Sequence, residues 1–282
     1  MLRCWLLLGC AACLLSGLGC SRPQGGDASA RAQAVAGHYG RSQAFTADVR
    51  IIVRPAQEVD GAIERGEMLS FSVSLWGTRD DRLRISCKKF NVPFLEAMIE
   101  ADGSFIAVLV RDEALVEGNL RDIAEAVSRG DASGGAVFSE LTTITDILRY
   151  GPLGRAGHWR WNEDQSRLRG VIAARDAKDA GAANWWWDVE LRGNSVLSSS
   201  LLNHDLKPYF HLRFTHEQEF DRLIRAQGNH LEVAGDPSSY LFRLQRIAAV
   251  PSISASSLAL NVPEWPRLGI DEFLNLLVQG EP

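Results

Sequence analysis

Apolar and polar side chains alternate along most of the chain after residue 44. Between Phe45 and Val53 every second residue is apolar, and the same pattern returns at 69–75 and at 83–87. A period of two sends successive side chains to opposite faces of a strand, so each run predicts a strand with one buried and one solvated face. Half-buried strands of this kind are typical of antiparallel sheets.

Short links join the predicted strands. Asp102-Gly103 separates apolar runs at 94–100 and 105–110, and this pair is a strong hairpin signal because Gly tolerates the positive φ of a tight turn. The first five strands therefore predict a meander. Further strands are predicted between residues 158 and 247, with turns that include Gly193-Asn194 and Gly228-Asn229.

The period changes between residues 120 and 150. Leu141, Ile144, Ile147 and Leu148 recur there at helical spacing, and Gly151-Pro152 ends the segment. The pattern predicts helices at about 120–150, inserted between two sets of strands. The end of the chain also has a short amphipathic run, which favours a helix.

About a dozen strands in sequence order predict a mainly β (α+β) protein. One curved antiparallel sheet of this size curls toward an incomplete β-barrel, or half-barrel, and the helices at about 120–150 are available as a helical lid over its apolar concave face. Such a fold can enclose a cavity for acyl chains, although a core filled with side chains would show the same alternation. The residues expected to line the cavity are Phe71, Val73, Leu75, Leu83, Ile85, Phe105, Leu109, Ile144, Ile147, Leu148, Trp185, Trp187, Phe210, Leu212 and Phe214.

The three consecutive tryptophans form the most unusual local feature. On a strand, Trp185 and Trp187 share one face and Trp186 takes the other. Core packing is expected for the first pair. Trp186 is left open between the core and a membrane or partner surface, where aromatic residues are favoured.

The N-terminus has the layout of a secretory signal. A basic start and a short apolar run lead through small residues to Cys20, and the run is too short to span a membrane as a helix. This layout predicts a signal peptide at 1–19 and a lipid anchor on Cys20, followed by a flexible tether to residue 40 and one domain at 41–282 with a tail at 264–282. The alternative is cleavage after Ala30 or Ala34, which would release a soluble periplasmic protein.

Composition and residue spacing argue against several other classes of function. The net charge of −5 gives no indication of nucleic-acid binding, and 46% apolar residues support a globular protein. After removal of the signal peptide and acylation of Cys20, Cys87 is the remaining free thiol, so no intramolecular disulfide is expected. The six histidines have no spacing typical of metal ligation, and no nucleophile elbow accompanies Asn203-His204-Asp205, so we expect neither an enzyme nor a cofactor.

Several longer motifs resemble a known family, the outer-membrane lipoprotein carriers and receptors of Gram-negative bacteria, which share the LolA/LolB-like fold. The order of the motifs is most similar to that of the lipoprotein receptor member, which is itself a lipoprotein. The motifs are LSFSVSLWGTRDDRLRIS at 69–86, AMIEADGSFIAVLV at 97–110, FSELTTITDILRYGPLG at 138–154, HWRWNEDQSRLRGV at 158–171 and FRLQRIAAVPSISASSLALNVP at 242–263.

The resemblance implies a half-barrel whose apolar interior takes the acyl chains of lipoproteins and passes them to the outer membrane. It also implies a protruding loop whose apolar tip touches lipid, here Val92, Phe94 and Leu95, although this stretch equally suits an ordinary strand entry. In the sorting system that this family serves, Ser rather than Asp after the anchor cysteine implies delivery to the outer membrane, and here that residue is Ser21. The function predicted is therefore an outer-membrane-anchored lipoprotein that binds lipid or lipoprotein acyl chains, and the alternative is a scaffold lipoprotein of an envelope complex with a filled interior.

Overall fold

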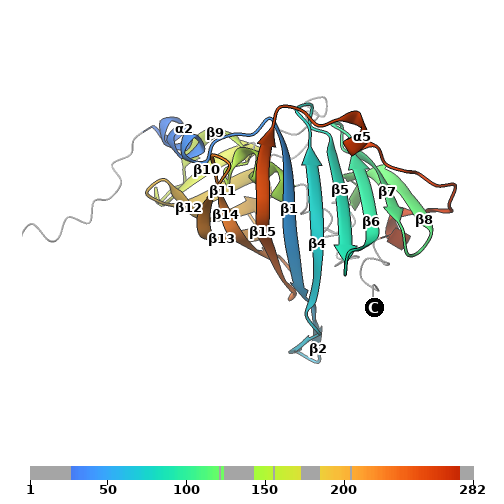
Figure 1. The fold of residues 1–282 in the computed structure, drawn as a ribbon. Coiled ribbons are helices and arrows are strands. Elements are labelled where there is room, and N and C mark those ends of the chain that lie inside the picture. The colour runs from blue at the N-terminus through green and yellow to red at the C-terminus, as the bar shows by residue number, and fades with distance from the viewer. Residues whose placement is uncertain are drawn as a thin grey trace, which may run out of the picture.

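The computed structural model describes residues 27–120, 122–123, 143–154, 156–172, 185–203 and 205–273. The predicted signal peptide, Cys20 and residues 124–142 of the predicted lid lie outside these ranges. Where they are described, the residues form mostly β-structure (Figure 1). The helices are α2 (Ala28–Tyr39) and α5 (Ala255–Leu258), with further helical residues at 120, 122–123, 143–150 and 270–273.

Fourteen of the described strands form a single sheet, and two form a separate hairpin. The strand order in the large sheet is β16-β8-β7-β6-β5-β4-β1-β15-β14-β13-β12-β11-β10-β9. The strands are β1 (Ala44–Arg54), β2 (Ala56–Val59), β3 (Ala62–Arg65), β4 (Leu69–Gly77), β5 (Leu83–Lys89), β6 (Val92–Ile99), β7 (Ser104–Leu109), β8 (Ala114–Asn119), β9 (Gly157–Trp161), β10 (Arg167–Ile172), β11 (Trp185–Arg192), β12 (Ser195–Leu202), β13 (Pro208–Phe220), β14 (Leu223–Val233), β15 (Ser239–Val250) and β16 (Arg267–Leu268).

The large sheet consists of two meanders joined at one seam. The first runs from β1 through β4 to β8, the second runs from β9 to β15, and β1 pairs with β15 between them. All neighbours are antiparallel except β16, which pairs parallel with β8. The sheet curves but ends at β9 and β16 without closing, which confirms the predicted incomplete barrel (Figure 1).

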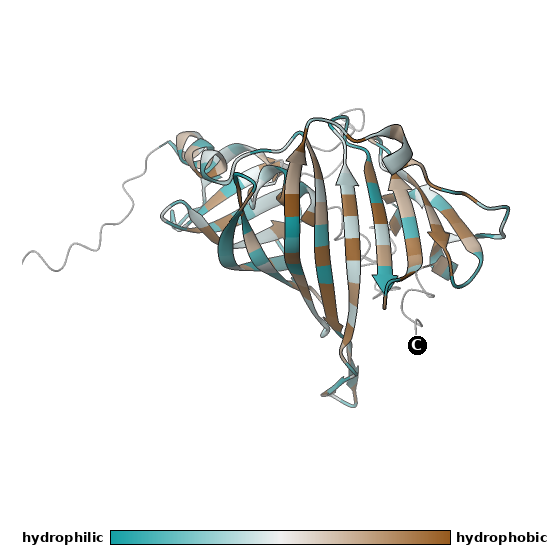
Figure 2. Ribbon diagram, in the orientation of Figure 1, coloured by the Kyte–Doolittle hydropathy of each residue, from teal (hydrophilic) through white to brown (hydrophobic). Residues whose placement is uncertain are grey.

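Hydropathy alternates along the strands as the sequence predicts (Figure 2). One face is lined by buried apolar side chains that form a single cluster, and we call it the inner face. The opposite face carries charged and hydroxyl side chains, such as Arg50 on β1, whose Nε donates to the Ser70 hydroxyl on β4 at 2.8 Å. The inner face is thus the core of the molecule, as expected for a sheet that is apolar on one side.

Part of the predicted flexible tether is folded, which corrects the sequence interpretation. Residues 28–39 form α2, whose N-terminus is capped by the Asp27 carboxylate accepting from the Ser29 N–H at 2.9 Å. The helix packs against β9, β12 and β14 through small or aromatic residues at helical spacing. These residues are Ala28, Ala32, Val35 and Tyr39. Small side chains allow a close approach of helix and sheet, so a segment with few large apolar residues still folds.

Two further differences concern strands. Gly228-Asn229 is not a turn, because β14 runs through it and the turn lies at Asp221-Arg222. The hairpin β2–β3 was not predicted, since its residues are nearly all exposed and carry no buried alternation. It projects from the end of the sheet where β1 finishes and β4 begins (Figure 1).

Candidate functional site

The residues predicted to line a cavity lie together on the inner face. Thirteen of the fifteen are exposed by 8% or less, and all thirteen belong to one cluster. Phe71 is half-buried and packs against that cluster, and the Trp185 side chain lies outside the described atoms. The alternating positions of the strands therefore lie on the buried face of the sheet. In this arrangement the described wall side chains are packed against other atoms and are not open to solvent.

The helical residues 143–150 cover part of this face. Ile144, Ile147 and Leu148 are buried in the same cluster as the sheet residues, which agrees with their predicted position in a lid. The chain then continues across the inner face, where the Trp187 indole Nε1 donates to the Pro152 carbonyl at 2.9 Å. This bond fixes Trp187, which also makes an edge-to-face contact with Phe210 at 5.7 Å between ring centroids.

A buried arginine holds the covering segment. The Arg225 side chain on β14 is 1% exposed, and its Nε donates to the Leu148 carbonyl at 2.8 Å. One terminal nitrogen donates to Arg149 and Gly40 carbonyls at 3.1 Å, and the other donates to the Tyr39 carbonyl at 2.5 Å. Arg225 thus satisfies carbonyls at the C-terminal ends of two helical segments, where backbone dipoles favour a positive charge. Burial lowers the pKa of the guanidinium to about 10.

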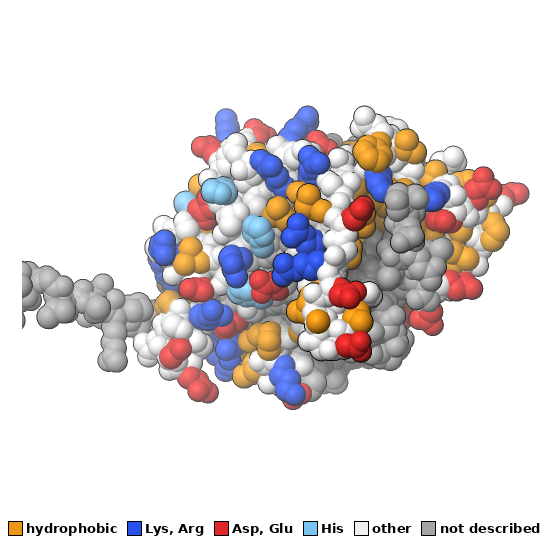
Figure 3. Space-filling model, turned by 90° about the horizontal axis from the view of Figure 1, so that it is seen from below, with side chains coloured by type: hydrophobic (Ala, Val, Ile, Leu, Met, Phe, Trp, Pro, Cys, Tyr) orange, Lys and Arg blue, Asp and Glu red, His pale blue; other side chains and the backbone are white. Residues whose placement is uncertain are grey.

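Exposed apolar side chains gather at one end of the sheet. Of the seven large apolar residues that are exposed in the described part of the chain, six lie at the end that holds the β2–β3 hairpin, the β5–β6 turn and the β12–β13 turn. Seen from that end, apolar side chains lie among Lys, Arg and acidic residues (Figure 3). We call this set the apolar rim: Val59, Ile63, Met68, Phe90, Val92 and Leu206.

The residues of the predicted membrane-probe loop differ in their exposure. Val92 is 64% exposed, but Phe94 is half-buried against Phe71 and Leu95 is buried on the inner face. The tip of the turn is Phe90, which is 90% exposed. Phe90 was missed because it precedes the predicted apolar stretch, although its position next to Asn91, which also has a positive φ, is typical of a turn.

Trp186 lies on the face opposite to Trp187. It is half-buried, and the Arg160 guanidinium lies over its ring at 4.4 Å from the centroid. This cation–π contact accounts for Trp186 within the outer face. The tryptophan run is therefore divided between the two faces of the sheet, as a strand requires.

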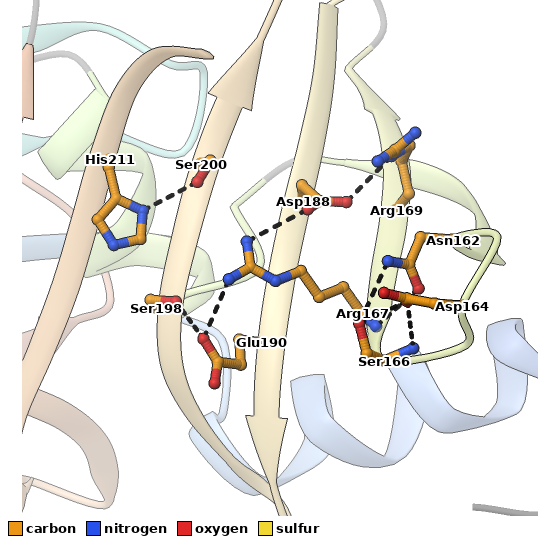
Figure 4. A network of polar contacts seen from close by, with 10 residues as sticks. All are labelled: Asn162, Asp164, Ser166, Arg167, Arg169, Asp188, Glu190, Ser198, Ser200 and His211. Atoms are coloured by element: carbon orange, nitrogen blue, oxygen red, sulfur yellow. Dashed lines mark hydrogen bonds and ion pairs between the residues drawn. The ribbon is translucent and has the colours of Figure 1, made fainter. Parts of the chain in front are cut away.

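The outer face of β10 to β13 carries a polar network (Figure 4). Asp188 accepts from Arg169 at 3.0 Å and pairs with Arg167 at 3.5 Å, while Glu190 pairs with Arg167 at 3.2 Å. Ser198 donates to Glu190 at 3.0 Å. These are cross-strand pairs on adjacent strands, and each group has a partner, so the network stabilises the sheet.

A contact between Ser200 and His211 in this network does not form a hydrolase site. The Ser200 hydroxyl lies 2.9 Å from His211 Nδ1, and partial burial lowers the pKa of the imidazole. Ser200 lies within β12, which is paired on both sides, so neighbouring N–H groups serve the sheet and are not free to form an oxyanion hole. In the described ranges no three His, Cys, Asp or Glu side chains are placed to hold a metal ion.

Two residues of the inner face that the sequence did not single out are polar. Ser199 and Asn229 are buried among apolar side chains, and each has an oxygen without a hydrogen-bond partner. Asn229 was missed because Gly-Asn reads as a turn. Arg225 was missed because an arginine on a strand is normally solvated.

Comparison with known proteins gives distant structural neighbours. No protein-family model matches the sequence, and no curated protein sequence matches it either. A LolA superfamily protein from Nitrosomonas europaea is 7% identical, with 84% of this chain and 99% of that chain covered at a TM-score of 0.49. A DUF1329 family protein from Desulfovibrio piger is 10% identical, with coverages of 82% and 97% and a TM-score of 0.45. A putative outer membrane lipoprotein-sorting protein domain from Vibrio parahaemolyticus is 10% identical, with coverages of 82% and 95% and a TM-score of 0.43.

None of the helices in the described ranges is both long and apolar enough to cross a membrane.

Proposed function

We propose that this chain is a lipoprotein of the outer membrane that binds lipid or lipoprotein acyl chains on the inner face of its half-barrel, without enzymatic activity. One observation carries the proposal. The apolar inner face is covered by Ile144, Ile147 and Leu148, which come from a separate helical segment and not from the sheet. Acyl chains can replace these side chains when the segment moves away. Each buried methylene contributes ~0.8 kcal/mol, so eight methylenes contribute roughly 6 kcal/mol before ordering costs.

The position of α2 supports a lipid anchor on Cys20. Cleavage after Ala30 or Ala34, the alternative, would cut through α2 and remove Ala28 from its contact with the sheet. A lipid on Cys20 leaves the helix whole and places it a few residues from the membrane. Replacement of Cys20 by Ala is expected to move the protein from the membrane fraction to the soluble fraction. Retention in the membrane fraction would contradict the anchor.

The apolar rim supports contact with lipid at one end of the sheet. In the β5–β6 turn, Phe90 and Val92 are exposed next to Lys88 and Lys89, and the Lys89 ammonium lies 6.0 Å from the Phe90 ring. Apolar side chains with adjacent cations suit an interface with anionic head groups. This turn, and not Leu95, is therefore the part of the predicted probe loop that we assign to the membrane.

The test is native mass spectrometry of the full chain, extracted from membranes in detergent. We expect copurifying acyl species that are lost after Leu148→Asp, because a charge in the covering segment would disrupt the site. Val262→Asp, at an exposed apolar position outside the apolar rim, is the matched control and should retain the acyl species. A wild-type protein free of acyl species would contradict the proposal.

The second candidate is a scaffold lipoprotein with a filled interior. The observation in its favour is the packing of the inner face, where Leu75, Ile85 and Leu212 are 0% exposed. In that case the covering segment is a permanent part of the core. The same experiment distinguishes the two, because a scaffold would copurify with protein partners and without lipid.

A further inference from the structure

Ser199 and Asn229 point into the apolar interior. Ser199 on β12 lies opposite Val189 and Leu212, both of which are 0% exposed members of the core cluster. Directly paired residues share a face of the sheet, so the Ser199 hydroxyl faces the same interior. Asn229 on β14 lies opposite Phe214 and Phe242 in the same way.

Both side chains have an unpartnered oxygen. The Ser199 hydroxyl has no hydrogen-bond partner and the residue is 0% exposed. Asn229 is 3% exposed, and its Nδ2 donates to the Phe242 carbonyl at 3.3 Å while Oδ1 accepts no bond. The Phe242 carbonyl can only accept, so the atom facing it must be the amide nitrogen, and the orphan is the oxygen.

Neighbouring serines on the same strand show the contrast. Ser198 and Ser200 point to the outer face, and both have partners, namely Glu190 and His211. A buried polar group without a partner costs roughly 1–3 kcal/mol, and such groups are rare in folded proteins. The inner face holds two such groups, and each destabilises the fold. An apolar residue at either position would remove the cost at that position.

The two atoms have complementary requirements. The Ser199 hydroxyl can donate to a carbonyl, while Asn229 Oδ1 needs an N–H or O–H donor. They lie on β12 and β14 with β13 between them, and Asn229 is two residues along β14 from Leu231, the residue level with Ser199. For strands ~4.8 Å apart and ~3.4 Å per residue, the two positions are on the order of 12 Å apart. The covering chain is held by Arg225 on β14 and by Trp187 on β11, so it crosses these same strands.

We propose that Ser199 and Asn229 form a polar subsite within the half-barrel, which selects acylated ligands that carry both a carbonyl and an N–H or O–H donor. This inference rests on the proposed acyl binding and specifies its ligand. The polar end of the ligand lies inside the sheet, where the two orphan atoms gain partners. A hydrocarbon chain alone leaves both atoms without a partner.

Three probes of equal chain length distinguish the contribution of the Ser199 hydroxyl from that of Asn229 Oδ1. Hexadecane offers no polar atom, methyl hexadecanoate offers a carbonyl acceptor, and 2-hydroxyethyl hexadecanoate adds an O–H donor at a distance from that carbonyl, as the separation of Ser199 and Asn229 requires. For the full chain in detergent, measured by native mass spectrometry in competition, we expect affinity to rise about tenfold at each step, which corresponds to ~1.4 kcal/mol. Asn229→Leu should abolish the preference for the hydroxyethyl ester over the methyl ester. Ser199→Ala should abolish the preference for the methyl ester over the alkane.

Controls keep the result interpretable. Ser200→Ala removes a hydroxyl from the outer face of the same strand and should leave both preferences unchanged. Equal binding of all three probes by the wild type would overturn the subsite while leaving acyl binding in place, whereas no binding of any probe would contradict the proposed function itself. In the unliganded protein, Ser199→Ala should raise the midpoint of thermal unfolding. A fall in that midpoint with unchanged ligand preferences would indicate a purely structural hydroxyl and would overturn the proposal.

Discussion

Arg225 joins three segments that are far apart in the sequence: α2, the helical residues 143–150 and β14. Its guanidinium has five N–H donors in a rigid plane, and four carbonyls from the first two segments accept from them. A lysine has a single ammonium and cannot reach all four. The position of the covering segment therefore depends on the planar shape of one side chain.

Replacement of Arg225 by Met should lower the free energy of unfolding by about 3 kcal/mol, because buried carbonyls lose their donors. Urea denaturation measures this change. Arg243→Met, on an exposed position of β15, is the matched control and should change the stability by less than about 0.5 kcal/mol. An equal loss of stability in both variants would mean that the hydrogen bonds of the Arg225 guanidinium do not stabilise the fold.

Cys87 predicts how stability depends on alkaline pH. Burial raises the pKa of the thiol from 9.0 to about 12. Above pH 9 the thiol ionises in the unfolded chain but keeps its proton in the native protein, so ionisation stabilises the unfolded state relative to the native state. The contribution is fully present below pH 9 and is lost as the pH rises toward 12.

The free energy of unfolding should therefore fall between pH 8 and pH 10.5, and more steeply in the wild type than in Cys87→Ala. Urea titrations at several pH values measure both slopes. Burial also raises the pKa values of Tyr39 and Tyr240, so part of the decline should remain in the variant. Identical slopes would show that the Cys87 thiol reaches solvent in the native state.

At the scale of elements, Gly151 fixes the contact between the end of the covering helix and α2. Its φ is 86°, and a Cβ placed there would lie 2.7 Å from the Tyr39 Cβ. Gly154 has a φ of 58° but no atom within 4 Å of the same position. Both glycines have a positive φ, but only Gly151 has a close neighbour. Substitution of each by Ala therefore distinguishes the cost of backbone strain from the cost of a steric clash.

Gly151→Ala should destabilise the protein by about 3 kcal/mol, through a positive φ and overpacking together. Gly154→Ala should cost about 1 kcal/mol, from the positive φ alone. Thermal unfolding of both variants gives the comparison. A smaller effect at Gly151 than at Gly154 would show that α2 is not tightly docked against this glycine.

Sequence patterns predicted the elements whose side chains alternate and missed those defined by tertiary contacts. The strands β1, β4, β5, β6 and β7 were found because one face of each is buried. In contrast, Gly228 was misread as a turn residue, although it allows β13 and β14 to approach: a Cβ there would lie 2.5 Å from the Thr215 Oγ1. The helix α2 has a weak pattern because its contacts use alanines.

For the candidate site, alternation identified the apolar wall but not its polar exceptions. Ser199 follows Ser198 and precedes Ser200 in a run of three serines, so nothing in the local sequence shows that the middle one faces the core. Strand parity assigns it to the inner face only once the register with Leu212 is known. The missing information was the register between distant strands, which the local sequence pattern does not reveal.

At the scale of the whole molecule, the two ends of the sheet differ, because the exposed apolar residues of the rim lie at one end. The β2–β3 hairpin carries Glu58, Asp60 and Glu64, which disfavour anionic lipid, whereas the β5–β6 turn carries Lys88 and Lys89. The turn is therefore expected to enter the head-group region first.

Phe90→Ser should weaken binding of the unlipidated chain, beginning at Ser21, to vesicles with anionic lipid by about tenfold. Sedimentation with the vesicles measures the bound fraction. Val262→Ser is the control, because Val262 is exposed outside the rim. Equal binding of the two variants would exclude the turn as a membrane contact.

The seam between β1 and β15 has a consequence for the rate at which the chain folds. Ala44 lies opposite Val250, so nearly the entire described chain must be available before the two meanders can join. Pairings of such long range close slowly, and we expect hairpin formation within each meander to precede a much slower final step. Until then β1 is an open strand edge that could pair with other molecules. Asp48, Arg50 and Arg54 place charges along that edge, which discourages aggregation until the seam has closed.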